Sequence, residues 1–347
     1  MNRYVLGSEK VFYDFIDSLS KDDKIGIITH VDLDGLASGI FLQKILEFKG
    51  LEPAFMEFFV YRSDILEPLL ERDFDVLFFT DWNADNFPDY LDKLRKKVKV
   101  LVVDHHPLNE ELEDKSNIIK TISGYCSAHA LFDLADKKNL FNTKEWIWLV
   151  CSAIIMDYIF NNEENSKFLE ECYPGIDKND IWNSEPGKTG QIIGNSLIYY
   201  RDDIKKVYDL VLEKDFDELR KDNDLVEEEI SKWVEKFKTD GEYFPEKKLH
   251  FYVGGPKYPV ASVIATKLSD EDFKDDTVVF VSDSNTQEGF VKLSARNQTG
   301  KINLSKILKK SIEGFEDSSA GGHVKASAGN FPKKYLGEFK KRLLENL

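Results

Sequence analysis

Residues 28–39 read ITHVDLDGLASG, and they place three potential metal ligands at the end of an apolar run. His30, Asp32 and Asp34 occupy alternating positions, and Gly35 follows where a helical pattern begins. Because residues two apart on a strand point to the same face, these side chains are expected to lie close together as the chain leaves the sheet. Capping of the following helix is the alternative role for Asp32 or Asp34 taken alone.

Similar apolar runs continue through the first half of the chain. They are rich in Val, Ile, Leu and Phe without alternation, as is typical of parallel strands covered on both faces, and they lie at 24–30, 53–61, 75–81 and 97–104. Helical patterns separate them, and further helices are expected at about 127–138 and 144–160. The first half therefore predicts a doubly wound α/β domain with a parallel sheet.

The second half predicts a connector and a smaller domain. Residues 161–192 are polar and contain Pro-Gly pairs, so they are expected to be irregular and to complete a first domain over 1–192. A strongly charged helical connector is expected over 193–244. Residues 245–347 predict a smaller α/β domain, and the active site is expected in the cleft between the two domains.

Composition excludes several classes of protein. Hydrophobic residues make up 42% and charged residues 32% of the 347 positions, a normal soluble mix without an apolar run long enough to span a bilayer, and the first residues do not form a signal peptide. Three cysteines, Cys126, Cys151 and Cys172, predict neither a disulfide framework nor a zinc knuckle, which favours a reducing cytoplasm. The net charge of −16 disfavours capture of long duplex DNA but allows a local basic groove.

Acidic and imidazole side chains recur where the predicted strands end. The third run ends at Asp81, the fourth ends in Asp104-His105-His106, and Asp157 lies within the apolar helical pattern LVCSAIIMDYIF. Sites in doubly wound sheets form at the carboxyl ends of the strands, so these residues are expected to converge. Taken singly, each has a plainer role as a helix cap, a surface histidine or a solvent-facing acid.

The donor types indicate a pair of divalent ions. The candidate ligands are His30, Asp32, Asp34, Asp81, His105 and Asp157. Mixed carboxylate and imidazole donors favour two Mn²⁺ ions per chain, and Mg²⁺ is a possible substitute. Two such ions suit hydrolysis at phosphorus, because they stabilise both the attacking and the leaving oxygen.

The four segments resemble the motifs of a known superfamily. HVDLDG, the aspartate of FFTDWN, DHH at 104–106 and the aspartate of SAIIMDYIF are similar to the motifs of the DHH phosphoesterases. GFVKLSARN and SSAGGHVKASAG resemble the substrate-recognition domain that accompanies many of these enzymes. The resemblance thus covers nearly the whole chain apart from the charged connector.

The resemblance implies a role for each residue. Asp32 and His30 would bind one manganese ion, Asp81 would bridge, and the other ion would be bound by Asp34, His105 and Asp157. His106 would contact the scissile phosphate or assist proton transfer, and Asp104 would orient a ligating histidine. His30 is the ligand that the family pattern supports least, because relatives differ at this position.

Six residues of the C-terminal domain are expected to bind substrate: Ser294, Arg296, Asn297, Gly321, Gly322 and His323. The Arg296 guanidinium has a shape suited to phosphate, and the double glycine allows close approach of backbone amides. A simple turn is the alternative reading of the double glycine. Trp82 and the pair Tyr61–Arg62 are candidates for stacking on bases or for ordinary packing.

The H-x-D-x-D-G form is more similar to RecJ-type and archaeal exonucleases than to nanoRNases. We expect no added oligonucleotide-binding barrel after the second domain, and therefore a compact cytoplasmic exonuclease that releases nucleoside monophosphates from single-stranded DNA or RNA. The alternatives are a nanoRNase or cyclic-dinucleotide phosphodiesterase with very short substrates, and a non-catalytic replication or repair scaffold. The connector could dock a helicase or a replication or repair protein, and no membrane partner is expected.

Overall fold

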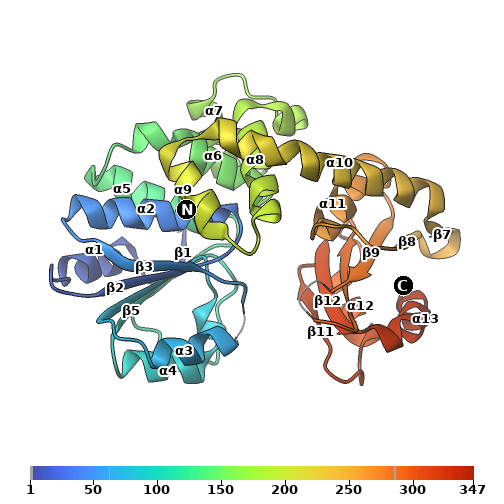
Figure 1. Cartoon of the computed structure of the whole chain (residues 1–347), viewed down its shortest axis with the longest axis horizontal. Helices are drawn as coiled ribbons and strands as arrows, with labels where there is room; N and C mark the ends of the chain where they lie inside the picture. Colours follow the sequence, from blue (N-terminus) through green and yellow to red (C-terminus); the bar gives the residue numbers. More distant parts are fainter. Residues whose placement is uncertain (1–2, 62, 285–286) are drawn as a thin grey trace. The chain divides into compact units, whose positions relative to one another are not determined.

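The computed structural model describes residues 3–61, 63–284 and 287–347. The chain divides into two compact units, residues 1–222 and 223–347, each containing its own six-stranded sheet (Figure 1). Within the described residues, no helix has both the length and the apolar character needed to cross a membrane.

The first unit contains a largely parallel sheet with the strand order β1-β6-β5-β4-β2-β3. Its strands are β1 Tyr4–Leu6, β2 Ile25–Thr29, β3 Pro53–Phe58, β4 Val76–Thr80, β5 Lys99–Asp104 and β6 Ile118–Thr121. Only β1 runs antiparallel, against β6. All residues of β2 and β4 are buried, as expected for central parallel strands.

Helices cover both faces of this sheet. They are α1 Glu9–Asp17, α2 Leu33–Phe48, α3 Leu66–Leu70, α4 Pro88–Arg95, α5 Ser127–Lys138, α6 Ile147–Met156, α7 Glu163–Cys172, α8 Glu185–Tyr199 and α9 Ile204–Glu213. One core joins the sheet to α1, α2, α5 and α6, and a second core joins the other face to α3 and α4 (Figure 1). The predicted doubly wound fold is therefore confirmed, although the short strands β1 and β6 were not predicted.

The prediction that residues 161–192 are irregular is wrong, because α7 and the start of α8 lie there. Pro186 lies in the first turn of α8, where a missing N–H costs nothing, and Ser184 caps the helix by accepting from Gly187 N. A side chain at Gly187 would collide with the carbonyl oxygen of Ile181, at 2.2 Å from its Cβ. The Pro-Gly pair thus marks a tightly packed helix start.

The second unit contains a mixed sheet with the strand order β11-β12-β10-β9-β8-β7. Its strands are β7 Glu242–Phe244, β8 Leu249–Gly254, β9 Thr277–Asp283, β10 Phe290–Arg296, β11 Ser319–Gly322 and β12 Ala326–Pro332. The helices are α11 Ala261–Glu271, α12 Leu304–Ser311 and α13 Leu336–Asn346, together with most of α10 Phe216–Asp240, which begins in the first unit. One sheet face packs on α12 and α13, and Trp233 and Phe237 of α10 pack against Phe280 on the other.

Candidate metal centre

The carboxyl ends of three central strands lie at the same level. Thr29 at the end of β2 pairs with Thr80 of β4, and Thr80 pairs with Val103 of β5. The chain leaves β2 toward β3 on one side, whereas β4 and β5 lie on the other, so the strand order reverses between β2 and β4. Binding sites of open α/β sheets form at this reversal. The residues that follow these strands therefore meet at one edge.

Asp32 and His30 form the first part of the site. Asp32 is the N-cap of α2 and accepts a hydrogen bond from Gly35 N at 3.0 Å, so it has the capping role that was its alternative. His30 Nδ1 lies 2.8 Å from Asp32 Oδ2. Desolvation raises the pKa of Asp32, but His30 and the Gly35 N–H outweigh it and bring the pKa below its ordinary value.

Asp34 is held by the amino end of α5. Its Oδ2 accepts from Ser127 N at 2.9 Å, and its Oδ1 accepts from Ala128 N at 2.8 Å. The first N–H groups of a helix have no partners within that helix and carry partial positive charge, so they suit a buried carboxylate. Asp34 is 3% exposed. The start of α5 therefore fixes the carboxylate that α2 supplies.

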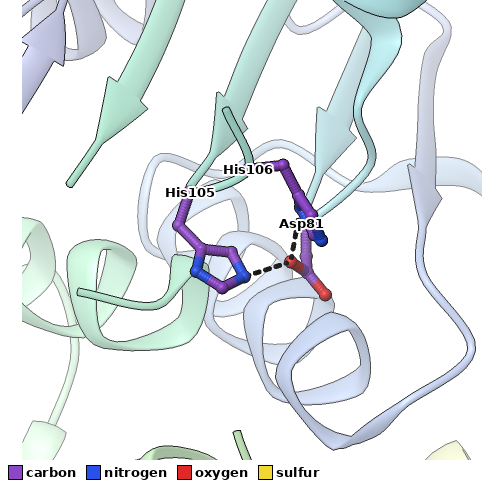
Figure 2. Close-up of side chains that lie close together, drawn as sticks. All are labelled: Asp81, His105 and His106. Carbon is purple, nitrogen blue, oxygen red and sulfur yellow. Dashed lines mark ion pairs between the residues drawn. The ribbon is translucent and has the colours of Figure 1, made fainter. Parts of the chain in front are cut away.

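Asp81 lies at the centre of the site. Figure 2 shows its carboxylate beside two imidazoles, with Oδ1 at 3.4 Å from His105 Nε2 and 3.8 Å from His106 Nδ1. Its Oδ2 lies 3.8 Å from His30 Nδ1. Burial and the neighbouring carboxylates, Asp34 first among them, raise the pKa of Asp81 well above its usual range. The φ of 51° at Asp81 is left-handed, a strained backbone conformation of the kind that clusters at functional sites.

His105 and Asp157 complete the cluster. His105 Nδ1 lies 3.7 Å from Asp157 Oδ2, and its Nε2 lies 3.9 Å from Asp34 Oδ2. Burial lowers the pKa of His105, but the surrounding carboxylates, Asp157 first, outweigh burial and raise it. Burial raises the pKa of Asp157 to about 8, although His105 opposes the shift. Asp157 lies directly after α6, and not within a helix as the sequence predicted, because the chain turns at Tyr158 with a φ of 57°.

His106 and Asp104 form a pair behind Asp81. His106 Nδ1 lies 2.8 Å from Asp104 Oδ1, and its Nε2 lies 3.1 Å from the hydroxyl of Tyr61. Asp104 is fully buried and also pairs with Lys120. Burial raises the pKa of Asp104, but the hydrogen bond from His106 and the charge of Lys120 prevail and lower it. Asp104 therefore accepts from both neighbours as a carboxylate.

The donor atoms at this site fit divalent cations. Three groups of residues each bring three donor atoms, one per residue, within 4.8 Å of one another. The groups are His30–Asp32–Asp81, Asp81–His105–His106 and Asp34–Cys126–Asp157. Three buried polar atoms of the site make no hydrogen bond within the described residues: Asp81 Oδ2, His105 Nδ1 and Asp157 Oδ2. A buried polar atom without a partner is costly, and a bound cation would remove that cost. Carboxylate and imidazole donors are also those that Mn²⁺ accepts.

Three further residues contribute to this site: sequence reasoning missed Cys126 and Lys120, and it considered Tyr61 only for base stacking or packing. The Tyr61 ring stacks on His30 with centroids 4.3 Å apart, and its hydroxyl lies 3.2 Å from the carbonyl oxygen of Asp81. Cys126 precedes α5, and its buried thiol has a pKa raised by desolvation and by Asp34. Lys120 is the third. A lysine within the apolar stretch around β6 was the one signal available in the sequence, since buried lysines need partners.

The residues predicted to stack on bases have other positions. Trp82 is fully buried in the core beneath α3 and α4, so the packing alternative is correct for it. Tyr61 packs against His30 and His106. Arg62 lies outside the described residues.

The six predicted substrate residues lie together in the second unit. Ser294 and Arg296 are on β10, and Arg296 Nε donates to Thr266 Oγ1 at 2.9 Å. Asn297 is buried and donates to Thr277 Oγ1, also at 2.9 Å. Gly321 and Gly322 end β11, and Gly322 has a φ of 129°, which favours glycine. His323 follows in an exposed turn, where its N–H donates to Ala326 O at 2.7 Å.

Comparison with protein families gave a match to the first part of the chain. The model of the "DHH family, N-terminal domain" matches residues 24–176, which include His30, Asp32, Asp34, Asp81, the 104–106 triplet and Asp157. The family resemblance seen in the sequence is thereby confirmed for residues 24–176. No curated protein matched the chain.

Solved structures share the fold at low sequence identity. RecJ from Thermus thermophilus in complex with Mn²⁺ has a TM-score of 0.74 and 17% sequence identity. The match covers 97% of this chain and 54% of that one, so this chain spans about half the length of that protein. An exonuclease RecJ bound to manganese has a TM-score of 0.72 and 16% identity, and the match covers 97% of this chain and 93% of that one. CDC45 from Entamoeba histolytica has a TM-score of 0.63 and 11% identity, and the match covers 97% of this chain and 98% of that one.

Proposed function

Because residues 24–176 match the model of the DHH family's N-terminal domain, we propose that this protein is a Mn²⁺-dependent phosphodiesterase that acts as a single-strand exonuclease. It would remove nucleoside monophosphates from single-stranded DNA, RNA or both. The observation that carries the proposal is the convergence of His30, Asp32, Asp34, Asp81, His105 and Asp157 at one sheet edge, with buried donor atoms that make no hydrogen bond. That donor set suits a pair of cations, and paired cations suit phosphoryl chemistry.

The proposed roles follow the geometry of the site. His30 and Asp32 would hold one ion, Asp34, His105 and Asp157 the other, and Asp81, which belongs to two of the close groups, would contact both. When bound, the ions would polarise the phosphate and activate water for in-line attack. The chain itself fixes Asp34 through the α5 amides and holds His106 beside Asp81, where its imidazole could contact the scissile phosphate.

The second unit would supply the substrate contacts that the same resemblance implies. Arg296 offers planar donors for a phosphate, although its Nε already donates to Thr266. The backbone around Gly321 is open, since a Cβ added there would meet no atom within 4 Å. A phosphate or a base could therefore approach this backbone closely.

A second candidate function is hydrolysis of very short substrates. The net charge of −16 favours it, because long nucleic acids are captured mainly through basic surface. In that case dinucleotides, oligomers of up to about five residues or cyclic dinucleotides would be cleaved faster than long strands. A non-catalytic scaffold is the remaining alternative, and the full set of donor side chains weighs against it.

The test is hydrolysis of labelled oligonucleotides of 2, 5, 12 and 24 residues, as DNA and as RNA, labelled at either end, with Mn²⁺ or Mg²⁺. We expect the wild type to release mononucleotides and Asp81→Asn to lose more than the roughly 100-fold that indirect partners of a metal typically contribute. Asp73→Asn, at an exposed aspartate paired with Lys24, is the matched control. Full activity in Asp81→Asn, or after chelation, would rule out the metal-dependent mechanism.

A further inference from the structure

A fully buried lysine lies behind the candidate metal centre. The side chain of Lys120, on β6, is 1% exposed. Its Nζ lies 2.7 Å from Asp85 Oδ1, donates to Asn83 Oδ1 at 2.8 Å and pairs with Asp104 Oδ2. Burial of an ammonium group is costly unless it is paired and hydrogen-bonded, and here three oxygens surround it.

Lys120 connects through Asp104 to His106. One oxygen of the Asp104 carboxylate faces Lys120, and the other lies 2.8 Å from His106 Nδ1. A carboxylate only accepts hydrogen bonds, so the imidazole proton must be on Nδ1. Nε2 is then the nitrogen that lies 3.1 Å from the Tyr61 hydroxyl. The ammonium group therefore fixes the carboxylate that selects one tautomer of His106.

Asp85 extends the same cluster to the loop after His106. One of its oxygens faces Lys120, and the other accepts from Asn109 N at 2.7 Å. Asn109 Nδ2 also donates to the carbonyl oxygen of Asp85 at 3.0 Å. Lys120 thus contacts both Asp104, the partner of the His106 ring, and Asp85, which anchors the loop that follows His106.

We propose that Lys120 is a positioning residue for His106, acting through Asp104 to fix the tautomer and the ring orientation of the imidazole. As far as hydrolysis is concerned, the proposal rests on the proposed function. The state of the ring itself can be measured without substrate or metal. A lysine with only a packing role would stabilise the fold without controlling His106.

The direct test is a long-range ¹⁵N–¹H correlation spectrum of the metal-free protein, with His106 assigned by comparison with His106→Asn. The wild type should show His106 protonated at Nδ1. In Lys120→Met/Asp85→Asn, which removes one charge of each sign, we expect averaged signals from two tautomers. Lys99→Met removes a half-exposed lysine from β5 and should leave His106 unchanged.

Two results of the spectroscopy would overturn the proposal. One is a wild-type His106 protonated only at Nε2, a result that needs no variant and holds even where the double variant does not fold. The other is a folded double variant whose His106 signals match those of the wild type.

Kinetics give an independent readout. In the double variant, kcat per folded molecule should fall by about 10- to 100-fold, with KM within about twofold, as is usual when an indirect partner of a metal site is removed. An unchanged kcat per folded molecule would show that Lys120 serves only stability. If the wild type hydrolyses no phosphodiester, the proposed function fails, while the spectrum still tests the role of Lys120.

Discussion

Tyr61 joins both halves of the candidate site through one side chain. Its ring stacks on His30, and its hydroxyl lies near His106 Nε2 and the Asp81 carbonyl oxygen. Tyr61→Phe would keep the stack and remove the hydroxyl, and a hydrogen bond of this kind contributes about 0.5–1.5 kcal/mol. We therefore expect hydrolysis of the preferred oligonucleotide to fall about 3- to 10-fold at unchanged metal affinity.

Tyr243→Phe is the matched control for this prediction. Tyr243 stacks on His250 with centroids 4.3 Å apart and belongs to the second unit. Tyr243 has the same kind of tyrosine–histidine stack but belongs to a different unit from the carboxylate cluster, so removing its hydroxyl should leave the rate unchanged. Equal effects of the two substitutions would contradict a specific role for Tyr61.

The site residues differ in how far sequence could predict them. His30, Asp81 and His105 follow buried strands, and the rule that parallel strands end at one edge was enough to bring them together. Tyr61 and Cys126 come from loops whose paths depend on tertiary packing. No local pattern in the sequence distinguishes their roles from ordinary burial.

Two buried aspartates of the site, Asp34 and Asp81, should have opposite effects on stability. Asp34 accepts two N–H groups at the start of α5, whereas Asp81 lies among other carboxylates and has a strongly raised pKa. We expect Asp34→Asn to lower the free energy of unfolding of metal-free protein by about 1–2 kcal/mol, because the amide leaves one helix N–H poorly matched. Asp81→Asn should raise the melting temperature, because it relieves repulsion.

Thermal unfolding in EDTA measures both effects, with Asp73→Asn as the exposed control. Added Mn²⁺ should then stabilise the wild type more than Asp81→Asn, since a ligand that binds only the folded state raises its stability. If Asp81→Asn destabilised the metal-free protein as much as Asp34→Asn does, the two carboxylates would both be structural.

Helix α5 also contains a buried histidine that should make stability depend on pH. His129 is 1% exposed, and its Nδ1 lies 3.2 Å from Asn165 Oδ1. Burial lowers the pKa of His129 to about 4. The unfolded chain, with a pKa near 6.5, binds more protons between pH 4 and 6.5, so stability falls as pH falls through this range. From pH 7.5 to 5, the contribution lost is about 2 kcal/mol.

Urea unfolding of the wild type and His129→Gln at several pH values checks this prediction. The difference in unfolding free energy between the two proteins should change by about 2 kcal/mol between pH 7.5 and 5. Parallel pH profiles would show that His129 does not become charged on unfolding in this range.

At the scale of elements, sequence predicted the long regular ones best. The central strands and α2 have apolar patterns long enough to reveal their period, whereas β1 has only three residues and β6 four. The Pro-Gly pair at 186–187 was misread because the same dipeptide suits a turn or the first turn of a helix. What distinguishes the two is the contact of Gly187 with Ile181, which only the folded chain reveals.

Over the whole molecule, charge is unevenly distributed along the chain. The chain has a net charge of −16, yet residues 290–347 contain twelve Lys and Arg against five Asp and Glu, a net charge of +7. The net charge of the whole chain argued against capture of long nucleic acids, because that average hides the positive charge of residues 290–347. The basic segment includes the strands and the turn that contain the predicted substrate residues.

Two exposed lysines flank those residues. Lys301 follows Gly300, and Lys325 follows the turn at His323. A Cβ added at Gly300 would lie 3.1 Å from Lys325 Cε, so the two loops are adjacent. Lysines near a bound strand would contact its phosphates and make binding depend on salt.

If the protein acts on single strands of several nucleotides, Lys301→Glu/Lys325→Glu should raise KM several-fold for a 12-residue oligonucleotide and leave kcat unchanged. The slope of log affinity against log salt should become shallower by about 1.4, the value for two phosphates on a single strand.

Lys309→Glu/Lys310→Glu is the matched control, because α12 packs on the sheet face that contains Leu293, opposite to Ser294. A dinucleotide should be cleaved equally by all three proteins, since it carries too few phosphates to gain from the lysines. If both charge reversals weakened binding alike, the effect would come from net charge and not from a path for the strand beside His323.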